Sequence, residues 1–410
     1  MKYLALLLAG SAVFLAACGG DDSAPCEGAG CAMDGGSADA QLPLDAADRD
    51  SGPVAGDSGP IGVDAGPCEA DPGITWGAPI TAPPLEWTFI PFPDSRCMNN
   101  TPTGIGVNIN PDASDVLIYL EGGGACFNFS TCLAVAHSDG FDASSLAAVA
   151  ASYAGRGIFN RTDPDNPLAD WSYVFIPYCT GDVHAGNNPD GYLHRVQVGY
   201  ANIGEYLERI VPTFRDHTRV LLTGSSAGGF GAALNYDRVQ RAFQCTPVTL
   251  LDDAGPPMSD EYMKPCLQQL WRDLWALDTT LPADCAACRG ADGGGLVNLA
   301  PYIAAKYPDR RFGLLSTTAD GVIRSFFGFG YSASCNSPAS MPSADFTAGL
   351  LDLRDTTIAP YDNFFTFYQD GTSHTFLGQT PSRITVGGTT LAEWIRRLVD
   401  DDPALAHVGP

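Results

Sequence analysis

Residues 220–229 read Val-Leu-Leu-Thr-Gly-Ser-Ser-Ala-Gly-Gly, and this stretch decides the fold. The apolar run Val220 to Leu222 is typical of a buried strand, and a helical pattern begins at Ala227. Between them lies Gly-x-Ser-x-Gly, whose small residues permit a sharp turn that exposes the central serine. We predict a strand–turn–helix unit with the Ser226 hydroxyl at its turn. Chance also produces so short a pattern, and Ser225 is a rival hydroxyl, so the surrounding chain must support a nucleophile here.

Apolar runs and helical patterns alternate on both sides of this unit. Such alternation predicts an α/β domain with a mostly parallel central sheet and helices on both faces. The predicted strands are 116–120, 173–176, 220–222, 248–251, 312–315 and 364–368, and the predicted helices are 144–153, 200–211, 227–243, 260–277 and 391–399.

A serine nucleophile needs a general base, and the chain has only six histidines. In hydrolases with this turn the residues follow the order nucleophile, acid, histidine, which leaves His374 and His407. His374 follows the last apolar strand, where a loop can bring an imidazole to the nucleophile. His407 lies in a polar tail, so we expect His374 to be the base.

The acid that orients the histidine must lie between Ser226 and His374. Asp320 follows the strand 312–315 and a short polar stretch, at the sheet edge where catalytic groups collect. Asp252 and Asp253 also end a strand but follow Ser226 closely, so they remain alternatives that could instead shape the site. We expect Asp320 to hold the imidazole in the tautomer that accepts the serine proton.

Three consecutive glycines, Gly122 to Gly124, follow the strand 116–120. They are costly to order and fit a backbone that approaches a ligand closely. Hydrolases of this type take one oxyanion donor from the residue after the nucleophile, here Ala227, and another from such a loop, here Gly124 or Ala125. The predicted chemistry is ester hydrolysis through an acyl-enzyme, and it needs no cofactor and no metal.

These motifs together resemble the pectin acetylesterase/Notum family of carboxylesterases. The resemblance covers roughly residues 75–400 and implies an α/β-hydrolase-like fold. It implies a triad of Ser226, Asp320 and His374, with oxyanion donors at Gly124, Ala125 and Ala227. The matching stretches are Tyr119–Gly124 with Cys126, Phe175–Gly186, Gly224–Gly229, Asp253–Gly255 and Ser373–Thr375.

The chain departs from the family pattern at three places. The stretch around Asp320 differs from the usual Asp-x-x-Gln, Ala125 stands where the family often has Trp, and Ser225 stands where it often has Cys. Loss of the Trp should reshape the acyl pocket and leave the mechanism intact.

Polar residues at two other places are predicted to line the substrate pocket: Tyr178 and Asp182 in one loop, and Asp253 after its strand. Asp182 and His184 could instead bind a metal ion, but no third ligand is evident.

The N-terminus has the features of an export signal. Lys2 precedes an apolar stretch too short to span a bilayer, which ends in Leu-Ala-Ala-Cys at Cys18. This ending resembles a bacterial lipobox and implies cleavage before Cys18 and a lipid anchor on it. We therefore predict a lipoprotein signal at residues 1–18, with an outer-membrane or cell-surface address, and an ordinary signal peptide remains the alternative.

Cysteine usage agrees with export. The chain has 13 cysteines, so an even number remains once Cys18 carries a lipid. In an oxidising compartment this indicates disulfides, and close spacing suggests the pairs Cys26/Cys31, Cys126/Cys132 and Cys285/Cys288. A zinc or redox role for the last pair is the alternative, but no second such motif is present.

Residues 19–67 are rich in Gly, Ala, Ser, Asp and Pro without apolar periodicity, and we predict a disordered acidic tether there. The domain is predicted to occupy residues 68–410. The net charge of −25 argues against nucleic-acid binding, which requires Lys and Arg to replace phosphate counterions.

The sequence thus predicts an exported serine esterase that acts on acetyl or other short acyl esters, with extracellular polysaccharide as the expected substrate. Two alternatives remain open: a hydrolase of long-chain acyl esters or polyesters, and a non-catalytic binding lipoprotein on a hydrolase scaffold. A protease is a weaker reading, because the same triad can cleave amides.

Overall fold

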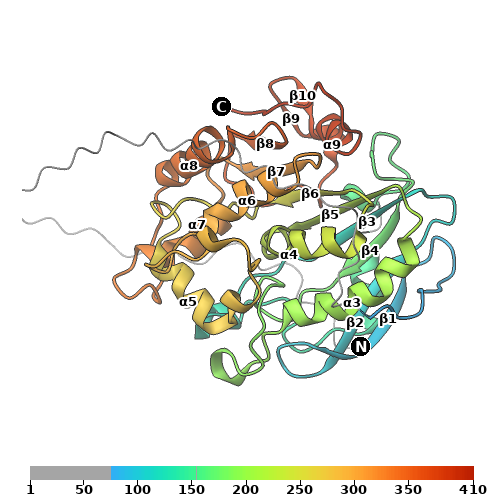
Figure 1. Ribbon diagram of the computed structural model, residues 1–410, viewed down its shortest axis with the longest axis horizontal. Helices are drawn as coiled ribbons and strands as arrows, with labels where there is room; N and C mark the ends of the chain where they lie inside the picture. The colour runs from blue at the N-terminus through green and yellow to red at the C-terminus, as the bar shows by residue number, and fades with distance from the viewer. Residues whose placement is uncertain (1–74, 154) are drawn as a thin grey trace, which may run out of the picture. The chain divides into compact units, whose positions relative to one another are not determined.

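The computed structural model describes residues 75–153 and 155–410. An eight-stranded sheet has the strand order β1-β2-β4-β3-β5-β6-β7-β8 (Figure 1). The six strands β4, β3, β5, β6, β7 and β8 run parallel to one another. Strands β2 and β1 extend the sheet beyond β4, and each pairs with its neighbour in antiparallel fashion. The prediction of an α/β fold with a mostly parallel sheet is confirmed.

All six predicted strands are present as parallel members of the sheet. The two antiparallel strands, β1 (Thr88–Arg96) and β2 (Pro102–Asn108), were not predicted. β1 contains two prolines, which cannot donate to a sheet ladder and are tolerated at an edge. The parallel strands are β3 (Asp115–Leu120), β4 (Ser172–Ile176), β5 (Arg219–Ser225), β6 (Val248–Asp253), β7 (Phe312–Thr317) and β8 (Phe364–Gln369).

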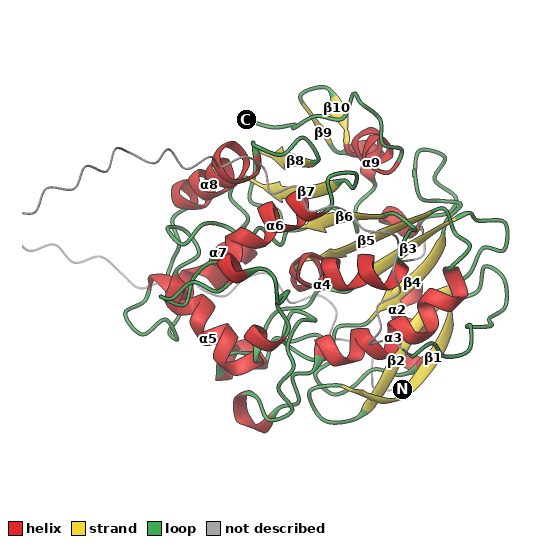
Figure 2. Ribbon diagram, in the orientation of Figure 1, coloured by secondary structure: helices red, strands yellow, loops and turns green. Residues whose placement is uncertain are grey.

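Helices cover both faces of the sheet, as predicted. On one face α3 (Gly199–Phe214), α4 (Ala227–Phe243) and α6 (Leu299–Lys306) lie in front of the strands in Figure 2 and share their core. On the other face α2 (Ala143–Tyr153) and α9 (Leu391–Val399) pack on a second core. The remaining α-helices are α1 (Phe129–Cys132), α5 (Pro265–Trp275), α7 (Gly321–Phe327) and α8 (Ser343–Asp352).

The register of the parallel strands brings their carboxyl ends to one edge. Leu120 of β3 pairs with Gly224 of β5, and Ser225 of β5 pairs with Asp253 of β6. Asp253 in turn pairs with Leu315 of β7. The loops that leave these strands therefore start side by side, which is where open α/β sheets place their ligand sites.

Disulfides join the loops around this edge. The predicted pairs Cys126–Cys132 and Cys285–Cys288 are confirmed, and two long-range pairs, Cys97–Cys179 and Cys266–Cys335, were not predicted. Cys245 is disulfide-bonded as well. The predicted signal (1–18), the tether (19–67), Cys18 and the pair Cys26/Cys31 lie outside the described residues.

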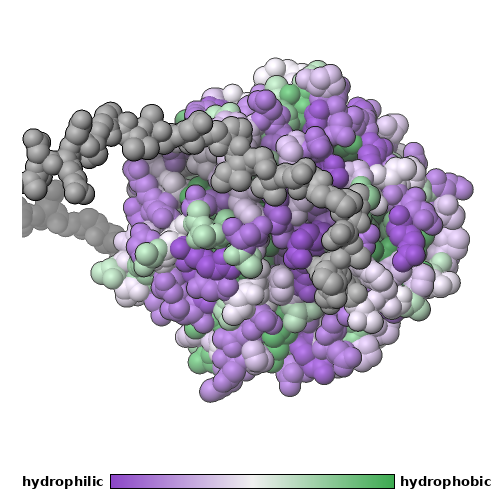
Figure 3. Space-filling model, viewed as in Figure 1, coloured by the Kyte–Doolittle hydropathy of each residue, from purple (hydrophilic) through white to green (hydrophobic). Residues whose placement is uncertain are grey.

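The surface drawn in Figure 3 is mostly hydrophilic, with apolar residues in scattered small patches. Among the residues that the structure describes, no helix combines the length and the apolar character needed to cross a bilayer.

Candidate active site

Ser226 lies at the turn between β5 and α4. Its backbone has φ 60° and ψ −120°, a strained conformation for a residue with a side chain. The Ser226 side chain is almost buried, and its amide donates to the Asp253 carbonyl oxygen at 2.7 Å. Strain of this kind at a strand-to-helix turn is typical of the nucleophile in hydrolases with this motif.

The small residues of the motif are required by close backbone contacts. A Cβ atom at Gly228 would lie 1.9 Å from the Leu120 carbonyl oxygen, so no larger residue fits beside strand β3. The rival hydroxyl, that of Ser225, donates to Asp253 at 2.7 Å. The turn therefore presents Ser226 and keeps Ser225 in a protein hydrogen bond.

His374 and Asp320 meet in the loops that follow β8 and β7. The imidazole Nδ1 of His374 lies 2.7 Å from Oδ2 of Asp320, whose side chain is fully buried. The other carboxylate oxygen, Oδ1, accepts from the amides of Val322 and Ile323 and caps α7. Two helical amides and an imidazole thus hold the carboxylate in one orientation, with Nε2 of His374 left for a proton partner.

The alternative acids make other contacts. Asp253 is fully buried and accepts hydrogen bonds from Ser225 and from the amides of Phe376 and Leu377. Burial raises the pKa of Asp253, although these hydrogen bonds oppose the shift. Burial raises the pKa of Asp252 far more, and its Oδ1 accepts from the Gly255 amide at 2.7 Å. The structure brings His374 to Asp320 and leaves both alternatives behind the site.

Several backbone amides near Ser226 donate to no protein acceptor within the described residues. Within the described residues, the N–H groups of Gly124, Ala125 and Ala227 donate to no protein acceptor, and all three residues line a pocket with Ser226. Gly124 has φ +85°, which favours glycine. The amide of Ala227 is also the first of helix α4, whose N-terminal end favours negative charge. The arrangement can therefore stabilise an oxyanion on a group bound to Ser226.

The pocket, which we call the apolar pocket, encloses about 710 Å³, solvent at its mouth included. Among the described residues that line it, Ser226 supplies the only hydroxyl and none has a charged side chain. Aromatic and branched residues from α4, α5, α6 and α7 form most of the wall. Prominent among them are Phe230, Trp271, Trp275, Leu277, Leu299 and Phe326.

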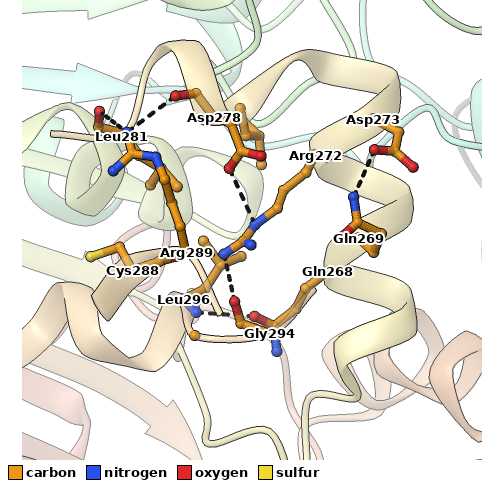
Figure 4. Close-up of polar contacts among 12 residues, drawn as sticks. Gln268, Gln269, Arg272, Asp273, Asp278, Leu281, Cys288, Arg289, Gly294 and Leu296 are labelled. Carbon is orange, nitrogen blue, oxygen red and sulfur yellow. Dashed lines mark hydrogen bonds and ion pairs between the residues drawn. The ribbon is translucent and has the colours of Figure 1, made fainter. Parts of the chain in front are cut away.

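A buried polar cluster fixes the wall of the apolar pocket at α5 (Figure 4). The guanidinium of Arg272 is almost fully buried and donates to the carbonyl oxygens of Cys288 and Gly294, the latter at 2.6 Å. Gln268 on the same helix accepts from the Leu296 amide at 3.0 Å. These bonds tie the loop closed by the Cys285–Cys288 disulfide to α5, whose tryptophans face the pocket.

A second cavity, which we call the polar cleft, lies on the other side of Ser226. It is open to solvent, spans about 960 Å³ with that solvent included, and is lined by both polar and apolar residues. Ser226 and His374 both line it, together with Tyr119, Glu121 and Tyr153. The proposed nucleophile therefore borders two cavities of different character.

Glu121 supports the glycine loop at the edge of the polar cleft. Its Oε2 accepts from the Tyr178 amide at 3.0 Å, and its Oε1 lies 3.1 Å from Nε2 of His137. Burial lowers the pKa of His137, but the hydrogen bond and charge of Glu121 outweigh it, so the pKa is raised. Sequence reasoning did not single out Glu121, although it directly precedes the three glycines.

The three residues predicted to line the substrate pocket are placed elsewhere. Tyr178 is fully buried, with its hydroxyl accepting from the Val183 amide at 3.0 Å. Asp182 is also fully buried and accepts from Thr180 and from the Gly199 amide. Asp253 lies behind the turn, as described above. Their polar atoms hold loops, and none of the three is among the described residues that line either cavity.

His184 makes a structural contact as well. Its Nε2 lies 2.8 Å from the Glu121 carbonyl oxygen, and burial lowers its pKa to about 4. In the described part of the chain, no cluster of His, Cys, Asp and Glu side chains has the composition of a metal site.

Comparisons with known proteins agree with the described geometry. A family model described as Pectinacetylesterase matches residues 91–290. The chain is 32% identical over 151 residues to palmitoleoyl-protein carboxylesterase notum2 of Xenopus laevis, which is 35% of this chain and 30% of that protein. It is 31% identical over 166 residues to palmitoleoyl-protein carboxylesterase NOTUM of Mus musculus, which is 39% of this chain and 31% of that protein. The chain thus spans about a third of the length of these relatives.

The chain is also similar to a further relative and to a solved structure. Inactive palmitoleoyl-protein carboxylesterase notum1b of Danio rerio is 32% identical over 100 residues, which is 67% of its length and 23% of this chain. The solved structure of the Wnt deacylase Notum from Drosophila superimposes with a TM-score of 0.57 at 16% identity. That superposition covers 79% of this chain and 96% of the other, and it identifies a shared fold.

Proposed function

Because the chain belongs to the pectin acetylesterase/Notum family, we propose that it is a serine carboxylesterase with the triad Ser226, His374 and Asp320. One relative is named inactive, so belonging to this family does not by itself establish that a protein is an active esterase. The observation that carries the proposal is the convergence of parts at one sheet edge. The strained Ser226 and Gly124 line both cavities, His374 of the 2.7 Å His374–Asp320 pair lines the polar cleft, and Ala125 and Ala227 line the apolar pocket.

Acylation uses each of these parts in turn. Nε2 of His374 removes the hydroxyl proton as Oγ of Ser226 attacks the ester carbonyl, and Asp320 stabilises the imidazolium that forms. The amides of Gly124, Ala125 and Ala227 donate to the carbonyl oxygen as it becomes an oxyanion. The imidazolium then protonates the leaving alcohol, and the acyl group stays on Ser226 as an ester.

Deacylation repeats the same steps with water as the nucleophile. His374 removes a proton from water, the oxyanion forms again at the same amides, and Ser226 leaves with the proton returned by His374. The carboxylic acid is released and the enzyme is restored, so no cofactor is consumed.

The acyl half of the substrate fits the apolar pocket. Acetyl and other short groups on extracellular polysaccharide are the class predicted from the sequence. A second candidate, a longer acyl chain, is favoured by the composition of the pocket, whose lining among the described residues is apolar apart from Ser226. The relatives named palmitoleoyl-protein carboxylesterases also support a long acyl chain.

The alcohol half fits the polar cleft. Tyrosine rings beside polar groups, here Tyr119 and Tyr153 with Glu121, suit a hydroxyl-rich leaving group such as a glycan. A hydroxyl-bearing leaving group can bind there while its acyl chain occupies the apolar pocket.

The proposed location is outside the cell, with Cys18 as the lipid anchor in a bacterial outer membrane or at the cell surface. Disulfides such as Cys97–Cys179 are consistent with export. Retention of the full chain in the detergent phase after labelling with a radioactive fatty acid, and its loss in Cys18→Ala, would support the anchor.

Hydrolysis of a nitrophenyl ester series, from acetate to dodecanoate, tests the proposed function with the full chain. We expect activity that Ser226→Ala abolishes, and an optimum longer than acetate if the pocket holds the acyl group. The remaining alternative, a non-catalytic binding protein, would be supported by a folded wild-type protein that hydrolyses no ester of the series.

A further inference from the structure

Asp253 connects the nucleophile turn to the loop that carries His374. Its carboxylate is fully buried, and Oδ2 accepts from Oγ of Ser225 at 2.7 Å. The backbone carbonyl of the same residue accepts from the Ser226 amide at 2.7 Å. One residue of β6 therefore holds both serines of the turn.

The same carboxylate holds the chain that follows His374. The Phe376 amide donates to both Oδ1 and Oδ2, at 3.0 Å from each, and the Leu377 amide donates to Oδ2 at 3.0 Å. Between His374 and Phe376 the backbone reverses at Thr375, which has φ +60°. A non-glycine residue adopts this conformation only when the surrounding contacts enforce it, and Asp253 supplies those contacts.

The chain that precedes His374 is held by a different set of bonds. The Thr317 hydroxyl donates to the Ser373 carbonyl oxygen at 2.6 Å, and the Gly321 amide donates to the Thr372 carbonyl oxygen at 3.1 Å. Both donors flank Asp320. His374 therefore lies between two anchors, one that fixes it relative to Asp320 and one, at Asp253, that fixes it relative to Ser226.

We propose that Asp253 is a positioning residue which, with Ser225, sets the distance between the Ser226 hydroxyl and the His374 imidazole. This inference rests on the proposed function. Among the described hydrogen bonds, the Asp253 carboxylate contacts neither Oγ of Ser226 nor the His374 imidazole; it holds the turn at Ser225 and the loop after His374 in fixed positions relative to each other. We call the set of Ser225, Asp253, Phe376 and Leu377 the Asp253 bridge.

Breaking the Asp253 bridge should selectively slow proton transfer from Ser226 to His374. If the Asp253 bridge is broken, the His374–Asp320 pair keeps its own anchors, but the imidazole drifts relative to Ser226. A displacement of about 1 Å between reacting groups can cost about 100-fold in rate. Substrate binding should change little when Asp253 is substituted, because Asp253 is not among the residues that line either cavity, whereas Ser225 lines the polar cleft and its variants can also change KM.

The test compares Asp253→Asn, Ser225→Ala and Ser225→Cys with wild type in the full chain. For Asp253→Asn we expect kcat to fall about 100-fold with KM within about twofold, because in either orientation the new side-chain amide group faces the Phe376 amide, which lies 3.0 Å from both carboxylate oxygens. Ser225→Ala removes one hydrogen bond to Asp253, and its kcat should fall about fivefold. Ser225→Cys keeps a weak donor, so its kcat should lie between those of Ser225→Ala and wild type.

Asp252→Asn is the matched control, because Asp252 is the neighbouring buried acid on β6 and bonds only the Gly255 amide among the described groups. Amide hydrogen exchange of a peptide spanning residues 373–379 gives a readout independent of activity. We expect faster exchange there in Asp253→Asn and wild-type protection in Asp252→Asn, with the other strands unchanged in both.

Three results would overturn the proposal: a kcat for Asp253→Asn within threefold of wild type, a loss carried by KM alone, or exchange that rises equally throughout the sheet. If the wild type hydrolyses no ester, the proposed function fails, whereas the exchange comparison still decides whether Asp253 holds the His374 loop.

Discussion

The apolar pocket and the polar cleft meet at Ser226 but are built from different parts of the chain. The segments after β6 and β7, with α4, form the apolar pocket, whereas the loops after β3 and β8 contribute most of the polar cleft. Ser226 is the only hydroxyl-bearing residue on the pocket side, and Glu121, Ser225, His374 and two tyrosines line the cleft side. This difference suggests that acyl and alcohol preferences can change independently.

The two regions are also stabilised in different ways. The wall of the apolar pocket depends on Arg272, a buried cation whose partners are mainly backbone carbonyl oxygens. The edge of the polar cleft depends on Glu121, a buried anion whose partners are a backbone amide and His137. Each charge fixes a loop whose backbone polar groups would otherwise be unpaired, which is costly in a buried setting.

The largest expected effect comes from a change in the proposed triad, which serves substrates bound in both cavities. Asp320→Asn keeps an oxygen for the α7 cap but presents an amide N–H to Nδ1 of His374. The imidazole must then carry its proton on Nε2, where it cannot accept from Ser226. We expect kcat to fall about 10⁴-fold, by the same factor for every acyl chain and every alcohol.

Steady-state kinetics on acetate and octanoate esters check this, with thermal unfolding as the control for folding. A loss confined to one ester class would contradict the placement of Asp320 at a centre shared by both cavities.

The next-largest effect distinguishes acyl binding in the apolar pocket from alcohol binding in the polar cleft. Ala233→Phe fills the apolar pocket from α4, and should lower kcat/KM for octanoate about 30-fold, the equivalent of two to three methylene groups that lose their burial. Acetate hydrolysis should stay close to wild type.

Ala134→Phe in the polar cleft is the matched variant for this change. It should leave the preference for acyl length unchanged and reduce the hydrolysis of acylated glycans. Equal effects of the two variants on the octanoate-to-acetate ratio would mean that the acyl chain does not enter the apolar pocket.

The smallest effect concerns charge at the polar cleft. No lysine or arginine is among the residues that line it, and the chain has a net charge of −25. An acetylated neutral glycan should therefore be a better substrate than acetylated polygalacturonate, by about tenfold in kcat/KM at low salt, with a smaller difference as salt screens the repulsion. A preference for the polyanion at low salt would contradict this reading of the cleft.

The reacting groups could be predicted from the sequence because each follows a recognisable strand in a fixed order. Ser226 has a local motif, and His374 and Asp320 lie at strand ends in the order that this motif requires. The same reasoning did not show that the side chains of Tyr178 and Asp182 bond backbone amides, because a polar residue after a strand can point to ligand or to backbone, and sequence does not distinguish these directions.

The walls of the two cavities could not be predicted. Trp271 and Trp275 have the spacing of any amphipathic helix that packs on a core, so nothing in the sequence marks them as pocket residues. Asp253 was considered as an acid and as a pocket residue, but its contacts with the His374 loop join positions more than a hundred residues apart. Only the folded sheet brings such groups together.

Covalent trapping tests the central claim most directly. The full chain would be treated with a fluorophosphonate and digested, and the modified residue would be located by mass spectrometry, with Ser226→Ala and heat-unfolded protein as controls. We expect one stoichiometric adduct, on Ser226, that is absent from both controls. A folded wild-type protein that remains unlabelled, or an adduct on Ser225 in place of Ser226, would contradict the assignment of Ser226 as the nucleophile.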